Sequence, residues 1–153
     1  KSAQVLTAID HTWGAGLAFS PFDLGKSHAA ADISVHALTK YPSGGGDILM
    51  GSICTQDKSL HHQLLRTHAL QGIAISGDDT AQISRSLSSM ALRYRQHQHN
   101  TKILLSFLQS RDEFSQILHP SIQTHAGHTH WKMICQDEQG AGIISVIFTR
   151  NMI

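Results

Sequence analysis

The stretch D-I-S-V-H-A-L-T-K-Y-P-S-G-G-G-D-I-L-M-G (Asp32–Gly51) decides the fold of this chain. Its first part, Ile33–Leu38, is apolar and β-prone, and Lys40 follows it closely. The glycine-rich run S-G-G-G-D at 43–47 predicts a turn. Ile48–Cys54 then predicts a further strand. A strand, a turn and a second strand, with helices beyond, indicate an α/β architecture.

A second strand candidate lies upstream, at Gln4–Ile9, and it ends in Asp10. A short apolar run bounded by polar residues is typical of a buried strand in a parallel sheet. Asp10 and Lys40 would then lie at strand ends, where ligand sites of α/β sheets gather. A lysine amine can bond an aldehyde cofactor, and a carboxylate can pair with a protonated pyridine nitrogen. Taken alone, the pattern also fits a surface lysine.

Downstream, apolar residues recur at helical spacing and predict an amphipathic helix, either one long helix or two consecutive ones. Asp78 or Asp79 is the predicted N-cap. The residues of the stripe are Ile83, Leu87, Met90, Tyr94, Leu104 and Leu108. Pro120 ends the next piece, and Gly142–Thr149 predicts a strand.

Composition limits the class of protein. The chain has 153 residues, of which 41% are hydrophobic and 15% charged. This length and composition predict a folded domain rather than a disordered segment. The formal net charge of +1 gives no electrostatic case for nucleic acid or an anionic membrane. No apolar run reaches the roughly 18 residues that a membrane span needs. Cys54 and Cys135 form no metal-binding spacing, and we expect a reduced, cytoplasmic protein.

Some side chains allow both a binding and a structural interpretation. Closely spaced histidines occur in zinc sites, but no cysteine or carboxylate completes a set here, so no metal site is expected. These histidines are His61-His62, His97-x-His99 and His125-x-x-His128-x-His130. Arg85 and Arg93 could bind an anion, although a solvated or ion-paired role is favoured. Trp13 is expected to pack rather than to contact a substrate.

Four segments together carry a family resemblance. The Asp32–Gly51 stretch is similar to the signature D-[IV]-S-x-x-A-x-T-K-Y-x-x-G-H-S-D-x-x-x-G of the Cys/Met-metabolism enzymes that depend on pyridoxal phosphate (PLP). The run A-I-D-H-T-W-G-A-G-L-A-F (Ala8–Phe19) resembles their I-D-N-T-W segment. Asp78–His97 and His119–Lys132 resemble two later segments, in the same order. The resemblance therefore covers nearly the whole chain.

The resemblance implies a fold and a division of the chain. The fold would be α/β, part of a fold-type-I large domain with a mostly parallel sheet and helices. Residues 1–87 would be the C-terminal part of the PLP-binding domain. Residues 88–153 would be a connecting helix and the start of a small C-terminal α/β domain. Family members are more than twice as long, so the chain would be an internal fragment, and the fragment alone would be inactive.

The resemblance also implies site residues. Lys40 would carry PLP on its amine, and Asp10 would pair with the pyridine nitrogen. Thr39 would contact the cofactor phosphate through its hydroxyl. Many relatives have a serine where this chain has Ala37, so one phosphate contact would be missing.

The implied activity is carbon–sulfur bond cleavage in methionine biosynthesis or transsulfuration. Trp13 and the G-H-x-x-W-K run at 127–132 favour the beta-lyase branch over its gamma-synthase and gamma-lyase relatives. The reaction would be α,β-elimination of cystathionine to homocysteine, pyruvate and ammonia, in a homotetramer. No nucleic acid or membrane partner is implied.

Several positions depart from the family pattern. His11 replaces the usual asparagine, Ser86 replaces a glycine, and Ser88-Ser89 replaces Arg-Thr. The alternatives that remain are a gamma-type enzyme of the same family and a remnant that binds no cofactor.

Overall fold

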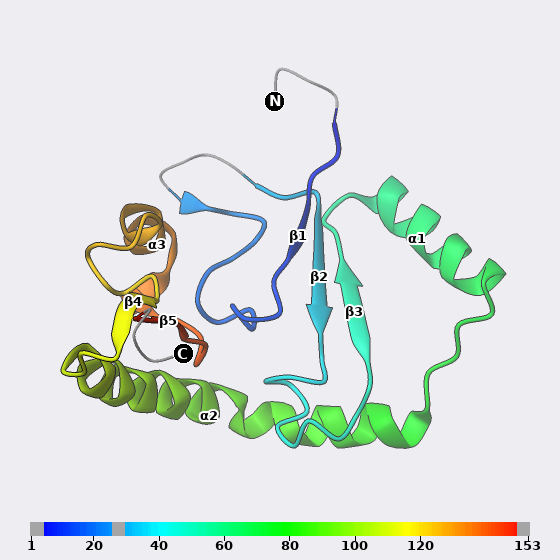
Figure 1. Ribbon diagram of the computed structural model, residues 1–153. Coiled ribbons are helices and arrows are strands. Elements are labelled where there is room, and N and C mark those ends of the chain that lie inside the picture. Colours follow the sequence, from blue (N-terminus) through cyan, green and yellow to red (C-terminus); the bar gives the residue numbers. More distant parts are fainter. Residues whose placement is uncertain (1–4, 26–29, 150–153) are drawn as a thin grey trace.

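The computed structural model describes residues 5–25 and 30–149. Figure 1 shows a sheet near the centre, a long helix below it, and a second small unit beside it. In chain order the elements are β1 (Ala8–Asp10), β2 (Ile33–Ala37), β3 (Gly51–Cys54), α1 (Lys58–Leu70), α2 (Gly77–Gln109), β4 (Phe114–Leu118), α3 (His128–Ile134), the 3₁₀ turn η2 (Gln136–Glu138) and β5 (Ser145–Phe148). The predicted α/β class is confirmed.

The first sheet is mixed, with β2 at its centre. β1 runs parallel to β2, with Asp10 opposite Val35. β3 runs antiparallel to β2, with Gly51 opposite Ala37. The described sheet is therefore not mostly parallel. The connection at 38–50 contains no crossover helix, and such a connection returns the chain in the antiparallel direction.

The predicted strands differ from the observed ones mainly at their ends. The strand predicted at Ile33–Leu38 is confirmed as β2, one residue shorter. The one predicted at Gln4–Ile9 is realised only at Ala8–Asp10, and Gln4 lies outside the described residues. Ile48 precedes β3 and is buried in the turn that leads to it.

The second sheet pairs β4 with β5 in an antiparallel ladder. β5 lies inside the strand predicted at Gly142–Thr149, but the sequence pattern does not predict β4. In the run F-S-Q-I-L of β4, apolar and polar residues do not alternate regularly. A bulge between Phe114 and Gln116 also interrupts the pairing of β4 with β5. A bulge breaks the period-2 pattern from which strands are predicted.

α2 is one continuous helix, which settles the alternative of two helices. Its N-cap is Ser76, whose hydroxyl accepts a hydrogen bond from the Asp79 amide at 3.3 Å. The prediction of Asp78 or Asp79 as the cap is therefore wrong. Both carboxylates lie in the first turn instead, where they interact favourably with the helix dipole.

The buried face of α2 follows the true helical period. Its buried residues are Ile83, Tyr94, Thr101 and Leu105. Two leucines of the predicted stripe are half exposed: Leu87, which shares the period of this face, and Leu104, which does not. Thr101 lies seven residues after Tyr94, and Leu105 lies four residues after Thr101, so all three share one face of the helix. Leu104 lies ten residues after Tyr94 and points to a different side.

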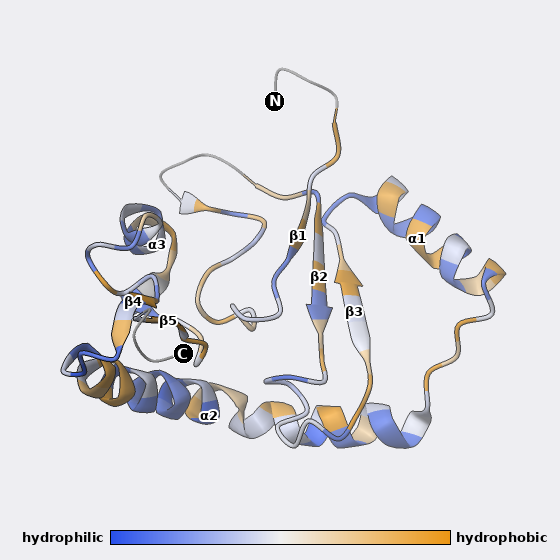
Figure 2. Cartoon of the chain, viewed as in Figure 1, coloured by the Kyte–Doolittle hydropathy of each residue, from blue (hydrophilic) through white to orange (hydrophobic). Residues whose placement is uncertain are grey.

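α1 is not predicted by the sequence pattern, because none of its residues is buried. Its start is well defined, since the Asp57 carboxylate accepts a hydrogen bond from the Leu60 amide at 2.7 Å. Figure 2 shows hydrophobic and hydrophilic residues interspersed along the helix. Within residues 5–25 and 30–149, no helix combines the length and apolar character that a bilayer span requires.

The main core is aromatic and joins distant parts of the chain. Tyr41, in the turn after β2, packs its ring at 4.7 Å from that of Tyr94 on α2. Ala15 and Ala18 complete the buried cluster. α2 extends from this cluster to the β4–β5 unit (Figure 1). The predicted division at 87/88 falls inside this continuous helix, and the assignment of the two parts to separate domains stays a prediction.

Candidate cofactor site

Asp10 ends β1, and Thr12 holds its carboxylate in place. The carboxylate accepts a hydrogen bond from the Thr12 amide at 2.9 Å. The Thr12 hydroxyl accepts one from the Ala37 amide at 2.9 Å and so ties this turn to the end of β2. Hydrogen bonds from the hydroxyl and then the amide of Thr12 lower the pKa of Asp10. The result is an exposed, ionised carboxylate at the junction of two parallel strands.

Lys40 lies in the turn that follows β2, with its side chain exposed. Its amine is 5.7 Å from the centroid of the Trp13 ring. The Trp13 ring in turn meets that of Tyr41 edge-on, at 6.2 Å and 88°. Trp13 therefore packs against the core, as expected, and also faces the lysine.

The glycines after Lys40 form a tight turn. Gly44 and Gly46 have φ angles of 79° and 71°, which glycine adopts without strain. The Ser43 hydroxyl donates to the Thr39 carbonyl at 2.6 Å and accepts from the Gly46 amide at 3.2 Å. The glycines thus serve the turn beyond the lysine, as the sequence predicts.

Thr39 directs its hydroxyl towards the end of this turn. The hydroxyl oxygen accepts a hydrogen bond from the Met50 amide at 3.3 Å. Its own proton is then available for an acceptor, as a phosphate contact would need. Two residues earlier, Ala37 offers only a methyl group.

α2 supports the turn through two side chains. The Arg93 guanidinium donates to the Tyr41 carbonyl at 2.7 Å. The Tyr94 hydroxyl donates to the Trp13 carbonyl at 3.1 Å, and burial raises the pKa of Tyr94. The interpretation of Arg93 as solvated or ion-paired is wrong, because its guanidinium donates to two backbone carbonyls and two serine hydroxyls.

His11 is buried next to Asp10. Its ring lies 4.3 Å from that of Phe19 and 6.4 Å from that of His36. Neither ring nitrogen makes a well-formed hydrogen bond. Burial, and secondarily the like charge of His36, lowers the pKa of His11, so the ring is held in its neutral form.

The three predicted residues share one edge of the sheet but not one enclosed pocket. Asp10 ends β1 and Lys40 follows the carboxyl end of the neighbouring parallel strand β2, and their charged groups form no ion pair with each other. A cavity of about 230 Å³ lies beside Lys40, and neither Asp10 nor Thr39 lines it. The residues around this cavity are Trp13, Lys40, Tyr41, Gly44, Arg93, His97 and Gly142.

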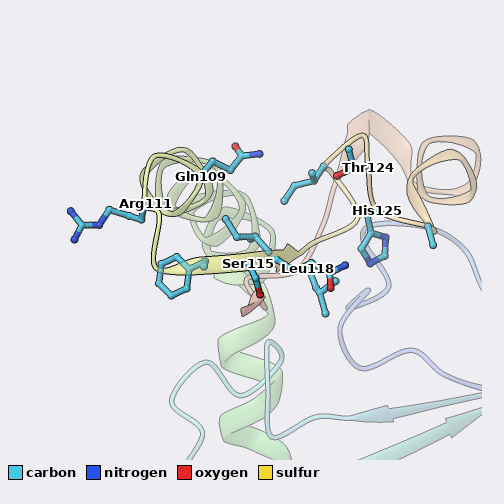
Figure 3. A pocket seen from close by; sticks show the side chains of 11 residues that line it. Gln109, Arg111, Ser115, Leu118, Thr124 and His125 are labelled. Carbon is cyan, nitrogen blue, oxygen red and sulfur yellow. The ribbon is translucent and has the colours of Figure 1, made fainter. Parts of the chain in front are cut away.

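A separate cavity of about 490 Å³ lies near the C-terminal end of α2 (Figure 3). Gln109, Ser115, Leu118 and His125 are among its lining residues. Sixteen residues of helix separate Gln109 from Arg93, which is about 24 Å along α2. None of the predicted site residues lines this cavity, and it plays no part in the site.

Sequence reasoning missed Thr12 and Tyr94 as supports of the site. A signal exists for Thr12, because an aspartate whose side chain accepts from the amide two residues later is a common turn motif. The D-x-T spacing of Asp10 and Thr12 fits it. No local signal marks Tyr94, because its partner lies 81 residues away.

These observations fit PLP. Lys40 presents an accessible amine, which the cofactor aldehyde requires. Asp10 presents a fixed anion suited to a pyridine N–H. Thr39 retains a hydroxyl proton for an anion. PLP bound in this way supplies an electron sink for negative charge that develops on a substrate carbon.

Comparison with known proteins gives the family. The model of the family described as Cys/Met metabolism PLP-dependent enzyme matches residues 1–152. A cystathionine beta-lyase of Bordetella avium is 33% identical over 140 residues, covering 92% of this chain and 34% of the relative. A putative cystathionine beta-lyase of Rhizobium johnstonii is 36% identical over 144 residues, covering 94% of this chain and 34% of the relative.

A solved structure supports the fold. The cystathionine gamma-lyase of Lactobacillus plantarum, complexed with L-serine, superposes with a TM-score of 0.89 at 21% identity, over 98% of this chain and 38% of its own. The chain thus spans about one third of the length of its curated relatives. A family model that matches almost every residue, together with a lysine and an aspartate at the ends of parallel strands, establishes that this chain belongs to the Cys/Met-metabolism family of PLP-dependent enzymes.

Proposed function

We propose that the protein containing this chain is a cystathionine beta-lyase, which cleaves L-cystathionine to homocysteine, pyruvate and ammonia. The observation that carries the proposal is the pairing of β1 with β2, which sets Asp10 and the turn of Lys40 at one sheet edge. In this role Lys40 would hold the cofactor through its amine. The Thr39 hydroxyl would donate a hydrogen bond to the cofactor phosphate.

Two protons matter in the proposed reaction. With a substrate amino acid bound at the cofactor, the free amine of Lys40 would take the proton from the substrate Cα. Asp10 would accept a hydrogen bond from the pyridine N–H of PLP and so keep that nitrogen protonated. The lowered pKa of Asp10 suits this task, because the carboxylate stays ionised near neutral pH. The electron pair released at Cα would form a Cα=Cβ bond as the homocysteine thiolate leaves Cβ with the electrons of the C–S bond, and one water would then hydrolyse the remaining enamine to pyruvate and ammonia.

Support for the beta-lyase reaction comes from two relatives and one side chain. The two relatives at 33% and 36% identity bear that name. Trp13 also lies beside Lys40, where it matches the tryptophan expected for this branch. A gamma-type enzyme is the second candidate, because a gamma-lyase shares the fold. We further propose a cytoplasmic homotetramer, and we expect the 153-residue chain alone to be inactive.

Product analysis separates these reactions. The full-length protein is incubated with cystathionine, and the keto acid and the thiol are identified. Cleavage of the Cβ–S bond gives pyruvate and homocysteine, as proposed. Cleavage of the Cγ–S bond gives 2-oxobutyrate and cysteine, which would move the protein to the gamma-lyase branch. A remnant would give neither product and no visible cofactor absorbance.

The role of Lys40 is tested by Lys40→Ala in the full-length protein. The visible absorbance of lysine-bound PLP and the release of pyruvate should both disappear. Lys102→Ala is a matched control, because Lys102 is an exposed lysine on α2. Turnover near the wild-type rate in Lys40→Ala would remove Lys40 from the proposal.

A further inference from the structure

Arg93 directs its whole guanidinium group at the turn that carries Lys40 and at its own helix. Nη1 donates to the Tyr41 carbonyl at 2.7 Å. Nη2 donates to the carbonyl and hydroxyl of Ser86 at 3.1 and 3.0 Å, and Nε donates to the Ser89 hydroxyl at 3.1 Å. Every nitrogen of the side chain therefore has a partner, and the group is fixed in one orientation.

The planar fork explains why an arginine occupies this position. The guanidinium donates hydrogen bonds to a carbonyl of the turn and to a carbonyl of α2 at the same time. A lysine ammonium, on its flexible stem, would hold these two carbonyls less rigidly. No carboxylate lies within ion-pair distance of Arg93 in the described ranges 5–25 and 30–149. The arginine is thus used to hold backbone, and the residue whose carbonyl it holds is the immediate neighbour of Lys40.

The turn itself is shaped to receive the guanidinium. A Cβ atom at Gly44 would lie only 2.9 Å from Cζ of Arg93 and 2.9 Å from the Ser86 hydroxyl. A side chain at this position would therefore displace the Arg93 guanidinium or the Ser86 hydroxyl, and the φ of 79° also favours glycine, so Gly44 lets the turn approach the helix with both groups in place. The Ser86 hydroxyl that completes the arrangement stands where the family pattern has a glycine, so this chain has one more bond to Arg93 than that pattern provides.

We propose that Arg93 is a positioning residue, which clamps the Tyr41 carbonyl to α2 and thereby fixes the backbone from which the Lys40 side chain extends. The aromatic packing of Tyr41 against Tyr94 and the bond from the Gly142 amide to the Tyr41 hydroxyl do not involve Arg93. Loss of the guanidinium therefore releases the turn without removing the core around it. The consequence for catalysis rests on the proposed function of Lys40, whereas the clamp itself does not.

The clamp is tested by hydrogen–deuterium exchange on the cofactor-free, full-length protein. The reporters are the amides of Ser43 and Gly44, which bond the carbonyls of Leu38 and Lys40. In Arg93→Gln these amides should exchange about ten-fold faster or more, while β2 and β3 keep their rates. Arg93→Lys should lie between Arg93→Gln and the wild type. The matched control is Arg95→Gln, because Arg95 is exposed on the same helix.

Two exchange results would overturn the proposal. One is an unchanged rate at Ser43 and Gly44 in Arg93→Gln. The other is a uniform acceleration through β2, β3 and α2, which would make Arg93 a general stabilising residue.

A kinetic measurement on the same variants tests the link to Lys40. PLP should attach to Lys40 more slowly in Arg93→Gln than in Arg95→Gln, and kcat should fall with little change in KM. A wild-type protein that never attaches PLP would refute the proposed function, while the exchange data would still decide the clamp. Normal attachment rates and normal kcat in Arg93→Gln would refute the link to Lys40.

Discussion

The Tyr94 hydroxyl donates a hydrogen bond to the backbone carbonyl of Trp13 at 3.1 Å, across 81 residues of sequence. Tyr94 is almost completely buried, at 1% exposure, and its ring packs against that of Tyr41. One α2 side chain therefore fixes the segment after β1 and the turn after β2 at once. Asp10 immediately precedes the first of these segments and Lys40 lies in the second, so the relative position of the proposed catalytic groups depends on α2.

Tyr94→Phe should lower the free energy of unfolding by about 1–3 kcal/mol, because a hydrogen bond is lost and the Trp13 carbonyl is left without its partner. The ring, and hence the aromatic packing, is retained. Urea unfolding followed by tryptophan fluorescence measures the change. Ser84→Ala, an exposed position on the same helix, should change stability by less than about 0.5 kcal/mol. Equal midpoints for Tyr94→Phe and the wild type would show that the hydroxyl contributes nothing.

Thr12→Val should raise the pKa of Asp10 towards its ordinary value of 3.8, because the Thr12 hydroxyl is the largest cause of the lowered pKa. Valine has nearly the shape of threonine, and the backbone amide of residue 12 still donates to the carboxylate. Carbon-13 NMR of the Asp10 carboxyl group follows the titration. Thr12→Ser keeps a hydroxyl and should leave the pKa near that of the wild type. An unchanged pKa in Thr12→Val would assign the effect to the backbone amide.

His11 should make stability depend on pH. Its pKa is lowered in the folded protein, so below about pH 6.5 the unfolded chain takes up a proton that the folded chain does not. The contribution of His11 to the free energy of unfolding therefore has its full value above the pKa of His11 in the unfolded chain. It falls as the pH drops from about 6.5 towards the pKa of His11 in the folded protein. His36 and His119, whose pKa values burial also lowers, contribute with the same sign.

His11→Asn, which restores the residue of the family pattern, should make this decline shallower. Each histidine contributes at most about 1.4 kcal/mol per pH unit. Urea unfolding at pH 7.5, 6.5 and 5.5 gives the slope. His99→Asn, at an exposed position on α2, should leave it unchanged. A slope in His11→Asn identical to that of the wild type would mean that folding does not lower the pKa of His11.

Local patterns predicted the elements whose signal is local. The apolar run that becomes β2 and the periodic face of α2 were both readable, because burial on one side produces a period in the sequence. α1 was not, since none of its residues is buried and no face is selected. The cap of α2 was misassigned because Ser76, Asp78 and Asp79 are all good N-cap residues, and only the backbone geometry distinguishes them.

The residues that support the site could not be predicted from local sequence patterns, for a different physical reason. Arg93 and Tyr94 act through bonds to residues 52 and 81 positions away, which depend on how the whole chain folds. Asp10, Thr39 and Lys40 were found through the family pattern, and their proposed roles stay predictions. The antiparallel direction of β3 likewise depends on the turn at 38–50 and not on the apolar run that predicts the strand.

Asp10→Ala should leave PLP bound to the full-length protein but slow pyruvate formation by about 100-fold or more, because the pyridine nitrogen loses the anion that keeps it protonated. Absorbance measures cofactor occupancy, and initial rates give kcat separately from KM. Asp10→Glu keeps the charge on a longer side chain and should be milder. Asp10→Asn keeps the shape and removes the charge, so it should resemble Asp10→Ala if charge is the cause. Wild-type activity in Asp10→Ala would mean that Asp10 does not face the cofactor ring.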